Sequence, residues 1–151
     1  MICFDTGTPI NKTGPTIYRP EDDGPRVKCV EYDGEDLIQA RPKTNRMHGG
    51  ACLALLDEKP ITVGSSISSG PNSGNSVEQL NGTSWISLKE FPADICHHSC
   101  LGMDDFLLVF GGSAAEPQDD WKKSEKVYMF QKSNWIIVGN LSQKVEKCLF
   151  R

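Results

Sequence analysis

The fold of this chain is decided by the stretch Phe106-Leu107-Leu108-Val109-Phe110-Gly111-Gly112 and by two apolar runs that follow it, Val127-Tyr128-Met129-Phe130 and Trp135-Ile136-Ile137-Val138. Five consecutive apolar residues before the glycines leave no polar side for water, which predicts a strand buried on both faces. The glycine pair allows a sharp backbone turn where a side chain would clash. The two later runs are rich in β-branched and aromatic residues and predict a hairpin.

This pattern recurs along the chain. Val127, Phe130, Trp135 and Ile136 have counterparts 50 positions earlier, and these have counterparts a further 48 positions back. The earlier sets are Val77, Leu80, Trp85 and Ile86, then Cys29, Tyr32, Leu37 and Ile38. The hairpin turn recurs as Asp33-Gly34 and Asn81-Gly82, dipeptides that supply the positive φ of a tight primed turn.

The apolar run before the glycine is repeated too. Cys52-Leu53-Ala54-Leu55 aligns with Cys100-Leu101-Gly102-Met103, and Ile61-Thr62-Val63-Gly64 aligns with Leu108-Val109-Phe110-Gly111. The alignment needs one residue of slippage at Asp57–Pro60. Several apolar columns, a turn and a glycine stop that recur together indicate a true structural repeat.

A period of about 50 residues with strand-type repeats is typical of propeller blades. The chain resembles the kelch-repeat family, whose blades show an apolar run that ends in a diglycine, then an aromatic residue, then a tryptophan. Phe106–Gly112, Tyr128 or Phe130, and Trp135 match that pattern. The second copy departs from it at Ser65 and Leu80, and the first copy has Leu37 in the tryptophan column.

The resemblance implies an all-β fold, a kelch-type β-propeller segment of four-stranded antiparallel blades whose ring is incomplete in this chain. Residues 1–46 would form a loop-rich N-terminal segment and the C–D hairpin of a partial blade, 47–94 one blade, 95–143 another, and 144–151 the start of a further strand. The expected blade strands are Ala51–Leu56, Pro60–Gly64, Val77–Leu80, Trp85–Leu88, Ser99–Met103, Phe106–Phe110, Val127–Phe130 and Trp135–Val138.

A propeller ring needs about four to eight blades, so two blades would leave apolar sheet faces uncovered. Three explanations stay open at this point. The chain is a fragment of a longer propeller, a truncated product without independent function, or a protomer that closes the ring by self-association.

The charge and the apolar content of the chain limit the kinds of partner and the compartments that are expected. The net charge is −4 and the pI is near 5.3, with no basic stripe, so nucleic acid is not an expected partner. No apolar run approaches the roughly 18 residues of a membrane span, so no membrane is expected either. Without a recognisable leader the expectation is a cytoplasmic protein. The alternative is secretion, suggested by N-glycosylation patterns at Asn11, Asn81 and Asn140, although Asn81 would already be explained by its hairpin turn.

The densest group of potential metal ligands is Cys96-His97-His98-Ser99-Cys100. It falls where the first strand of a blade is expected, and alternation would then point Cys96, His98 and Cys100 to one face and His97 to the other. Cys100 also shares an apolar column with Cys52, which predicts a small buried residue. We therefore expect no metal and no cofactor, and reduced core thiols for most of the six cysteines.

No catalytic constellation is visible. His48, His97 and His98 have no serine or cysteine partner in a triad context. Some kelch-fold proteins are copper radical oxidases, but Tyr18, Tyr32 and Tyr128 supply no matching ligand set. The sequence predicts a protein that is not an enzyme. The alternative is a fragment of a secreted propeller enzyme such as a copper oxidase.

The expected function is therefore a non-catalytic protein–protein interaction module, an adaptor or scaffold that binds through propeller loops. The loop Ser113–Lys126 is the best candidate, with binding residues Asp119, Asp120, Trp121, Lys122 and Lys123. A tryptophan flanked by charges in a polar loop has the composition of an interface anchor. The alternative is that Trp121 folds back over the blade edge. By resemblance, the partner could be a ubiquitin-ligase substrate or the cytoskeleton, but its identity is not encoded here.

Overall fold

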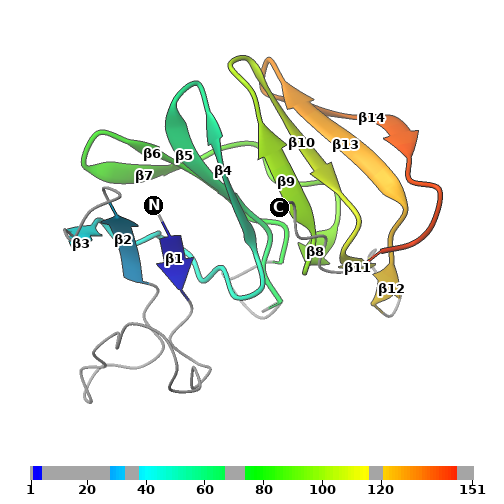
Figure 1. Ribbon diagram of the computed structural model, residues 1–151, viewed down its shortest axis with the longest axis horizontal. Coiled ribbons are helices and arrows are strands. Elements are labelled where there is room, and N and C mark those ends of the chain that lie inside the picture. The colour runs from blue at the N-terminus through cyan, green and yellow to red at the C-terminus, as the bar shows by residue number, and fades with distance from the viewer. Residues whose placement is uncertain (1, 5–27, 33–37, 67–73, 116–120, 146–151) are drawn as a thin grey trace.

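A computed structural model of the 151-residue chain describes residues 2–4, 28–32, 38–66, 74–115 and 121–145. All regular elements in these ranges are β-strands. They form two four-stranded antiparallel sheets that lie side by side and two smaller sheets (Figure 1). The all-β prediction is confirmed, and no closed barrel forms within the described part of the chain.

The two large sheets, which we call sheet I and sheet II, are built alike. Sheet I has the order β4-β5-β6-β7, and sheet II has the order β9-β10-β13-β14. All neighbouring strands in both sheets are antiparallel. Their strands are β4 (Cys52–Leu56), β5 (Lys59–Val63), β6 (Val77–Asn81), β7 (Ser84–Ser87), β9 (Ser99–Gly102), β10 (Phe106–Phe110), β13 (Lys126–Gln131) and β14 (Asn134–Asn140).

Two three-stranded sheets flank this pair. The N-terminal sheet joins β1 (Ile2–Phe4), β2 (Lys28–Tyr32) and β3 (Ile38–Arg41). The early hairpin pairs β2 with β3, but Tyr32 lies opposite Ile38, so the alignment of Leu37 with the tryptophan column was wrong by one residue. The Asp33-Gly34 turn lies outside the described residues. The other three-stranded sheet, which we call the end sheet, has the order β12-β11-β8. It consists of β8 (Asp94–Cys96), β11 (Ser113–Ala115) and β12 (Lys122–Lys123), and the sequence did not predict it.

The core lies between sheet I and sheet II. Ile61 and Val63 from β5 and Leu107 and Val109 from β10 are fully buried there. Burial of each such side chain contributes about 2 kcal/mol. Phe91, from the connection between the sheets, packs edge-on against Tyr128 and Trp135, with ring centroids 4.7 and 4.8 Å apart. On β10, Leu107 and Val109 point into this core, whereas Phe106 and Leu108 are only half-buried, so the prediction of a strand buried on both faces was wrong at those two positions.

Each sheet holds the connection that precedes it through one tryptophan. The indole Nε1 of Trp85 donates to the Pro42 carbonyl at 2.8 Å, and that of Trp135 donates to the Lys89 carbonyl at 3.1 Å. Both tryptophans pair with the apolar residue of the neighbouring strand that the repeat alignment predicts, Leu80 and Phe130. The tryptophan column of the repeat therefore has the same structural role in both sheets.

The turn between β4 and β5 and the turn between β6 and β7 have the positive φ that is typical of primed hairpin turns. Asp57 and Glu58 have φ of 54° and 58°, and the sheet I hairpin between β6 and β7 has φ of 61° at Gly82. The predicted position of this second turn was wrong by one residue. Asn81 is still paired with Ser84 in the ladder, so Gly82 and Thr83 are the central residues and Asn81 needs no special backbone conformation.

Strand pairing also corrects the repeat alignment. Leu53 pairs with Thr62 in sheet I, and Cys100 pairs with Val109 in sheet II. Because Thr62 and Val109 are equivalent, Cys100 corresponds to Leu53 and not to Cys52. The slippage expected at Asp57–Pro60 is therefore absent, and the two cysteines stand one residue apart in the repeat.

This offset reverses the direction of one cysteine, because successive residues of a strand point to opposite faces. Cys52 points from sheet I toward sheet II, and Cys100 points back. The two form a disulfide with a Cα–Cα distance of 5.9 Å. The prediction of reduced thiols was wrong for this pair, whereas Cys96 is a buried thiol that forms no disulfide.

The inner strands β4 and β9 approach too closely for any side chain at Gly102. A Cβ atom at this position would collide with the carbonyl oxygen of Leu55. By contrast, a Cβ at Gly139 would meet no atom within 4 Å. Gly102 therefore sets the distance between the two large sheets at their inner edge.

We expect the substitution Gly102→Ala to destabilise the protein by about 3 kcal/mol, at the upper end of the usual cost of overpacking. The matched control Gly139→Ala should change the free energy of unfolding by less than about 1 kcal/mol, because an added methyl group is accommodated there. Denaturant unfolding of both variants measures the difference. Equal stability of the two variants would contradict the close approach of β4 and β9.

Loss of the Cys52–Cys100 disulfide should also lower the free energy of unfolding. The bridge closes a loop with a sequence separation of 48, and loop-closure entropy then predicts a loss of about 4 kcal/mol for the variant Cys52→Ser with Cys100→Ser. Denaturant unfolding of this variant under non-reducing conditions tests the value. Wild-type protein in excess reductant should show the same loss, and an unchanged transition midpoint in reductant would argue against the bridge.

Candidate functional site

Of the five predicted binding residues, the structure describes Trp121, Lys122 and Lys123, which lie at one end of sheet II on or directly before β12 of the end sheet. β12 places Lys122 opposite Ala114 and Lys123 opposite Ser113. The amide of Ser124 donates to the Gly112 carbonyl at 2.8 Å, which ties the end of β12 to the diglycine after β10. Asp119 and Asp120 lie outside the described residues.

Trp121 stands immediately before β12 with 40% of its surface exposed. Lys122 and Lys123 beside it are exposed as well. A partly exposed indole next to two ammonium groups offers one large apolar contact and a positive rim, the combination that is common at the centre and edge of protein interfaces.

The glycine pair Gly111-Gly112 is what brings the end sheet to this position. Both glycines have positive φ, 67° and 81°. A Cβ at Gly111 would meet the Val145 carbonyl oxygen at 2.8 Å, and one at Gly112 would meet the Cys96 carbonyl oxygen at 2.7 Å. The backbone therefore turns out of β10 at a place where only glycine fits, and continues into β11.

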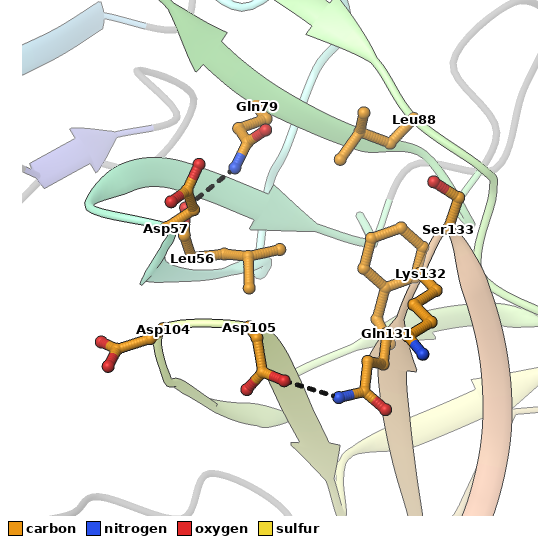
Figure 2. A pocket seen from close by; sticks show the side chains of 10 residues that line it. Leu56, Asp57, Gln79, Leu88, Asp104, Asp105, Gln131, Lys132 and Ser133 are labelled. Atoms are coloured by element: carbon orange, nitrogen blue, oxygen red, sulfur yellow. Dashed lines mark hydrogen bonds between the residues drawn. The ribbon is translucent and has the colours of Figure 1, made fainter.

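A groove of about 400 Å³ lies at the opposite end of the large sheets, where their hairpins turn (Figure 2). Its apolar lining comes from Leu56, Leu88 and Phe130. The rest of its lining is polar and consists of Asp57, Gln79, Asp104, Asp105, Gln131, Lys132 and Ser133. Both sheets contribute, so the groove exists only when they are packed together.

The polar side of the groove is acidic. Three aspartates and one lysine line it, so the formal charge is 3 × (−1) + 1 = −2. Figure 2 shows Asp57, Asp104 and Asp105 on the side opposite Lys132 and Ser133. Gln131 donates to Asp105 Oδ2 at 2.8 Å, and Lys59 lies 2.9 Å from Asp57 Oδ2. The groove has the charge to attract a cationic side chain and contains no histidine or cysteine.

The segment Cys96–Cys100 is not a single strand. β8 ends at Cys96 and β9 begins at Ser99, because His97 adopts a φ of 54°. The expected alternation of side chains across this segment was wrong for that reason. Cys100 is committed to the disulfide, and no group of three or more potential ligand side chains in the described ranges is placed to hold a metal ion.

His98 is a buried, neutral side chain in this segment. It lies between the two strand-end glycines, with its ring against Gly64 and its Cβ against Gly112. Neither ring nitrogen has a hydrogen-bond partner of good geometry. Burial lowers the pKa of His98 to about 3, with the Val63 backbone opposing the shift and His97 adding to it. His98 is therefore a packing residue that cannot serve as a proton donor near neutral pH.

A second buried histidine, His48, is paired with Glu78. The imidazole Nε2 lies 2.9 Å from Glu78 Oε2, and Nδ1 lies 2.8 Å from the Gly64 carbonyl oxygen. Both neighbours are acceptors, so both ring nitrogens must donate if Glu78 is ionised. The geometry therefore describes a buried imidazolium–carboxylate pair.

Glu78 also accepts bonds from the backbone. The amides of Asn45 and Arg46 donate to its two oxygens at 3.2 and 3.1 Å. Burial by itself raises the pKa of Glu78, but the bonds from His48, Arg46 and Asn45 together outweigh it and lower the pKa below 4.5. Since the side chains of His48 and Glu78 are 2% and 0% exposed, the pair holds the connection before β4 in place and cannot meet a substrate.

Together, the fold and these sites define a class: an all-β protein of packed four-stranded antiparallel sheets with candidate binding surfaces at both strand ends. Neither a protein-family model nor a curated protein matches this chain. No helix in the described ranges is long and apolar enough to cross a membrane.

The sequence analysis predicted a binding surface at Trp121, Lys122 and Lys123, and it missed the groove and the His48–Glu78 pair. The groove is assembled from three turns that are far apart in sequence, so no local motif marks it. A signal for the buried pair did exist. Glu78 interrupts an otherwise apolar strand column that Tyr128 occupies in sheet II, and a charged residue in such a column needs a partner.

The lowered pKa of His98 predicts acid sensitivity. The value of about 3 in the folded protein is below the ordinary 6.5, so protonation favours the unfolded chain and stability is highest above pH 6.5. As pH falls toward 3, this group alone should remove up to about 1.4 kcal/mol for each pH unit. Denaturant unfolding at pH 6.5, 5.8 and 5.0 measures the slope.

The same effect is visible without unfolding. In a proton NMR titration, the His98 ring resonance should stay constant from pH 8 to pH 4. It is the one histidine resonance that the variants His48→Gln and His97→Asn have in common. Asparagine tolerates the positive φ at position 97. A His98 titration with a midpoint near pH 6.5 would contradict its burial as a neutral ring.

Proposed function

We propose that this chain is a kelch-type propeller segment that works as a non-catalytic protein–protein interaction module. The observation that carries the proposal is the exposed Trp121 beside Lys122 and Lys123 on the end sheet. The strand edges and sheet faces inside the molecule are used in packing, so loops and turns at the strand ends are the surfaces left for recognition.

The kelch part of this proposal rests on the internal repeat. The two large sheets have the same strand order, the same tryptophan-to-backbone hydrogen bond and equivalent glycine stops. Gly64 has a φ of 79° at the end of β5, as Gly111 has 67° at the end of β10. These shared features support the proposal that both sheets are blades built from one repeated sequence pattern.

The same proposal includes self-association as a second mode of binding. Sheet II has one face that is not covered by sheet I, where Leu101 and Ile136 are 47% and 50% exposed. Leu101, Leu108, Met129 and Ile136 form one row across the four strands. Their counterparts in sheet I, Ala54, Ile61, Gln79 and Ile86, face sheet II, so a further blade-like sheet is the natural cover for the exposed row.

Two other functions remain as alternatives. One is a fragment of a secreted propeller enzyme such as a copper oxidase, and the other is a truncated product without independent function. Metal analysis together with an oxidase assay on the purified chain separates the first from the binding module. Size exclusion with light scattering and a denaturant melt distinguish the truncated product from the binding module. A discrete species that unfolds cooperatively indicates a genuine folded unit, and an aggregate or a monomer that unfolds without cooperativity indicates a truncated product.

The interaction role predicts a defined effect of Trp121→Ala. Proteins captured from native cell extract by the wild-type chain should include at least one that the variant loses, because removal of an interface anchor typically costs 2 kcal/mol or more, about a 30-fold weaker affinity. Ile86→Ala, which removes a similarly exposed apolar side chain from β7, is the matched control and should retain the partner. An identical set of captured proteins for all three chains would exclude Trp121 as the anchor.

A further inference from the structure

Two N-glycosylation patterns lie on the surface of the described structure. Asn81-Gly82-Thr83 begins at the last residue of β6 and continues into the turn before β7, and Asn140-Leu141-Ser142 begins at the last residue of β14. The two asparagines and both hydroxyl residues, Thr83 and Ser142, are exposed. An N-glycosylating enzyme must reach both the amide and the hydroxyl of the pattern, and the fold leaves both accessible.

The fold does not explain why position 81 is an asparagine. The turn is made by Gly82 and Thr83, while Asn81 occupies a regular ladder position opposite Ser84. Asparagine is depleted in strands, and the Asn81 side chain makes no hydrogen bond with any residue of the described structure. The structural reason that the sequence suggested for this residue, a positive φ in the turn, is therefore absent.

In the second glycosylation pattern, the middle residue Leu141 anchors the segment to the protein. The amide of Leu141 donates to the Glu125 carbonyl at 2.7 Å, which fixes the chain as it leaves β14. Leu141 is half-buried, whereas Asn140 and Ser142 on either side of it are exposed. The acceptor amide and the hydroxyl of this pattern are thus both held at the surface by one inward-facing leucine.

The disulfide is an independent observation that points to the same compartment. Cys52–Cys100 joins the inner strands of two separate sheets. Such structural bridges persist in oxidising compartments and are rare in the cytosol, where thiols are kept reduced. Of the two compartments that the sequence left open, the bridge favours the secretory pathway.

We propose that Asn81 and Asn140 are N-glycan acceptors and that the chain matures in the secretory pathway, where Cys52 and Cys100 are oxidised. In the glycosylation step, the side-chain nitrogen forms a bond to C1 of the first N-acetylglucosamine of a lipid-linked oligosaccharide diphosphate. The bond from C1 to the diphosphate oxygen breaks, the amide loses one proton, and the lipid diphosphate leaves.

The oxidation step requires a disulfide-carrying oxidoreductase. Cys52 and Cys100 give up two electrons and two protons, the bond between their sulfur atoms forms, and the oxidoreductase disulfide is reduced to a dithiol. Neither glycan position lines the groove. Asn81 lies at the hairpin end of sheet I, and Asn140 lies opposite Lys126 at the other end of sheet II, so the packed faces stay free of sugar.

The test is the mass of the full chain secreted from cultured eukaryotic cells behind a cleavable signal peptide, before and after peptide N-glycosidase. Release in heavy-oxygen water marks each former glycan site as an aspartate that peptide mapping locates. We expect sugar on Asn81 and on Asn140. Thr83→Ala and Ser142→Ala should each remove one glycan, while the conservative variants Thr83→Ser and Ser142→Thr should retain both.

The same peptide map, run without reductant, should contain the cross-linked peptide of Cys52 and Cys100 in every variant, which shows that loss of sugar is not loss of fold. The mapping is then repeated on the protein isolated from its native cells. Glycan at both positions and the Cys52–Cys100 bridge in that material would support the proposal. Unmodified asparagines or reduced thiols in the native protein would overturn it, as would secreted protein without sugar at either site.

Discussion

The close approach of the inner strands β4 and β9 is the constraint on which the rest of this structure depends. Gly102 leaves room for the Leu55 carbonyl, and the Cys52–Cys100 bridge joins the same two strands. With this edge fixed, β5 and β10 lie face to face and exclude water from Ile61, Val63, Leu107 and Val109. The groove at the hairpin ends follows, because its walls belong to different sheets.

The two large sheets hold the connection that precedes them through different side-chain contacts at one equivalent position. In sheet I, the inner column of β6 carries Glu78, which is neutralised by His48 and by two backbone amides of the preceding connection. In sheet II, the equivalent position of β13 carries Tyr128, which packs against Phe91 of the preceding connection. Both contacts hold a connection against its sheet. In sheet I the contact is a buried ion pair and in sheet II it is a pair of aromatic rings, so the two repeats share the position of the contact but not its chemistry.

The strands and their order could be predicted because they depend on local alternation and on glycine stops. All eight strands of the large sheets were located in this way, and the tryptophan column of these two sheets was identified correctly. The alignment of β4 with β9 was wrong by one residue because two cysteines were matched as equivalents. The end sheet was missed because β12 has two residues and Ser113–Ala115 lacks an apolar pattern.

By itself, the sequence determined an all-β chain with a repeat of about 50 residues, since the periodicity of apolar side chains and the glycine and tryptophan positions are local properties. Only the tertiary structure decided that Cys52 faces Cys100, that Glu78 is neutralised by His48, and that three aspartates share a groove. The physical reason is that side-chain direction depends on strand register and sheet packing. A shift of one residue reverses the face to which every side chain points, and composition alone does not record it.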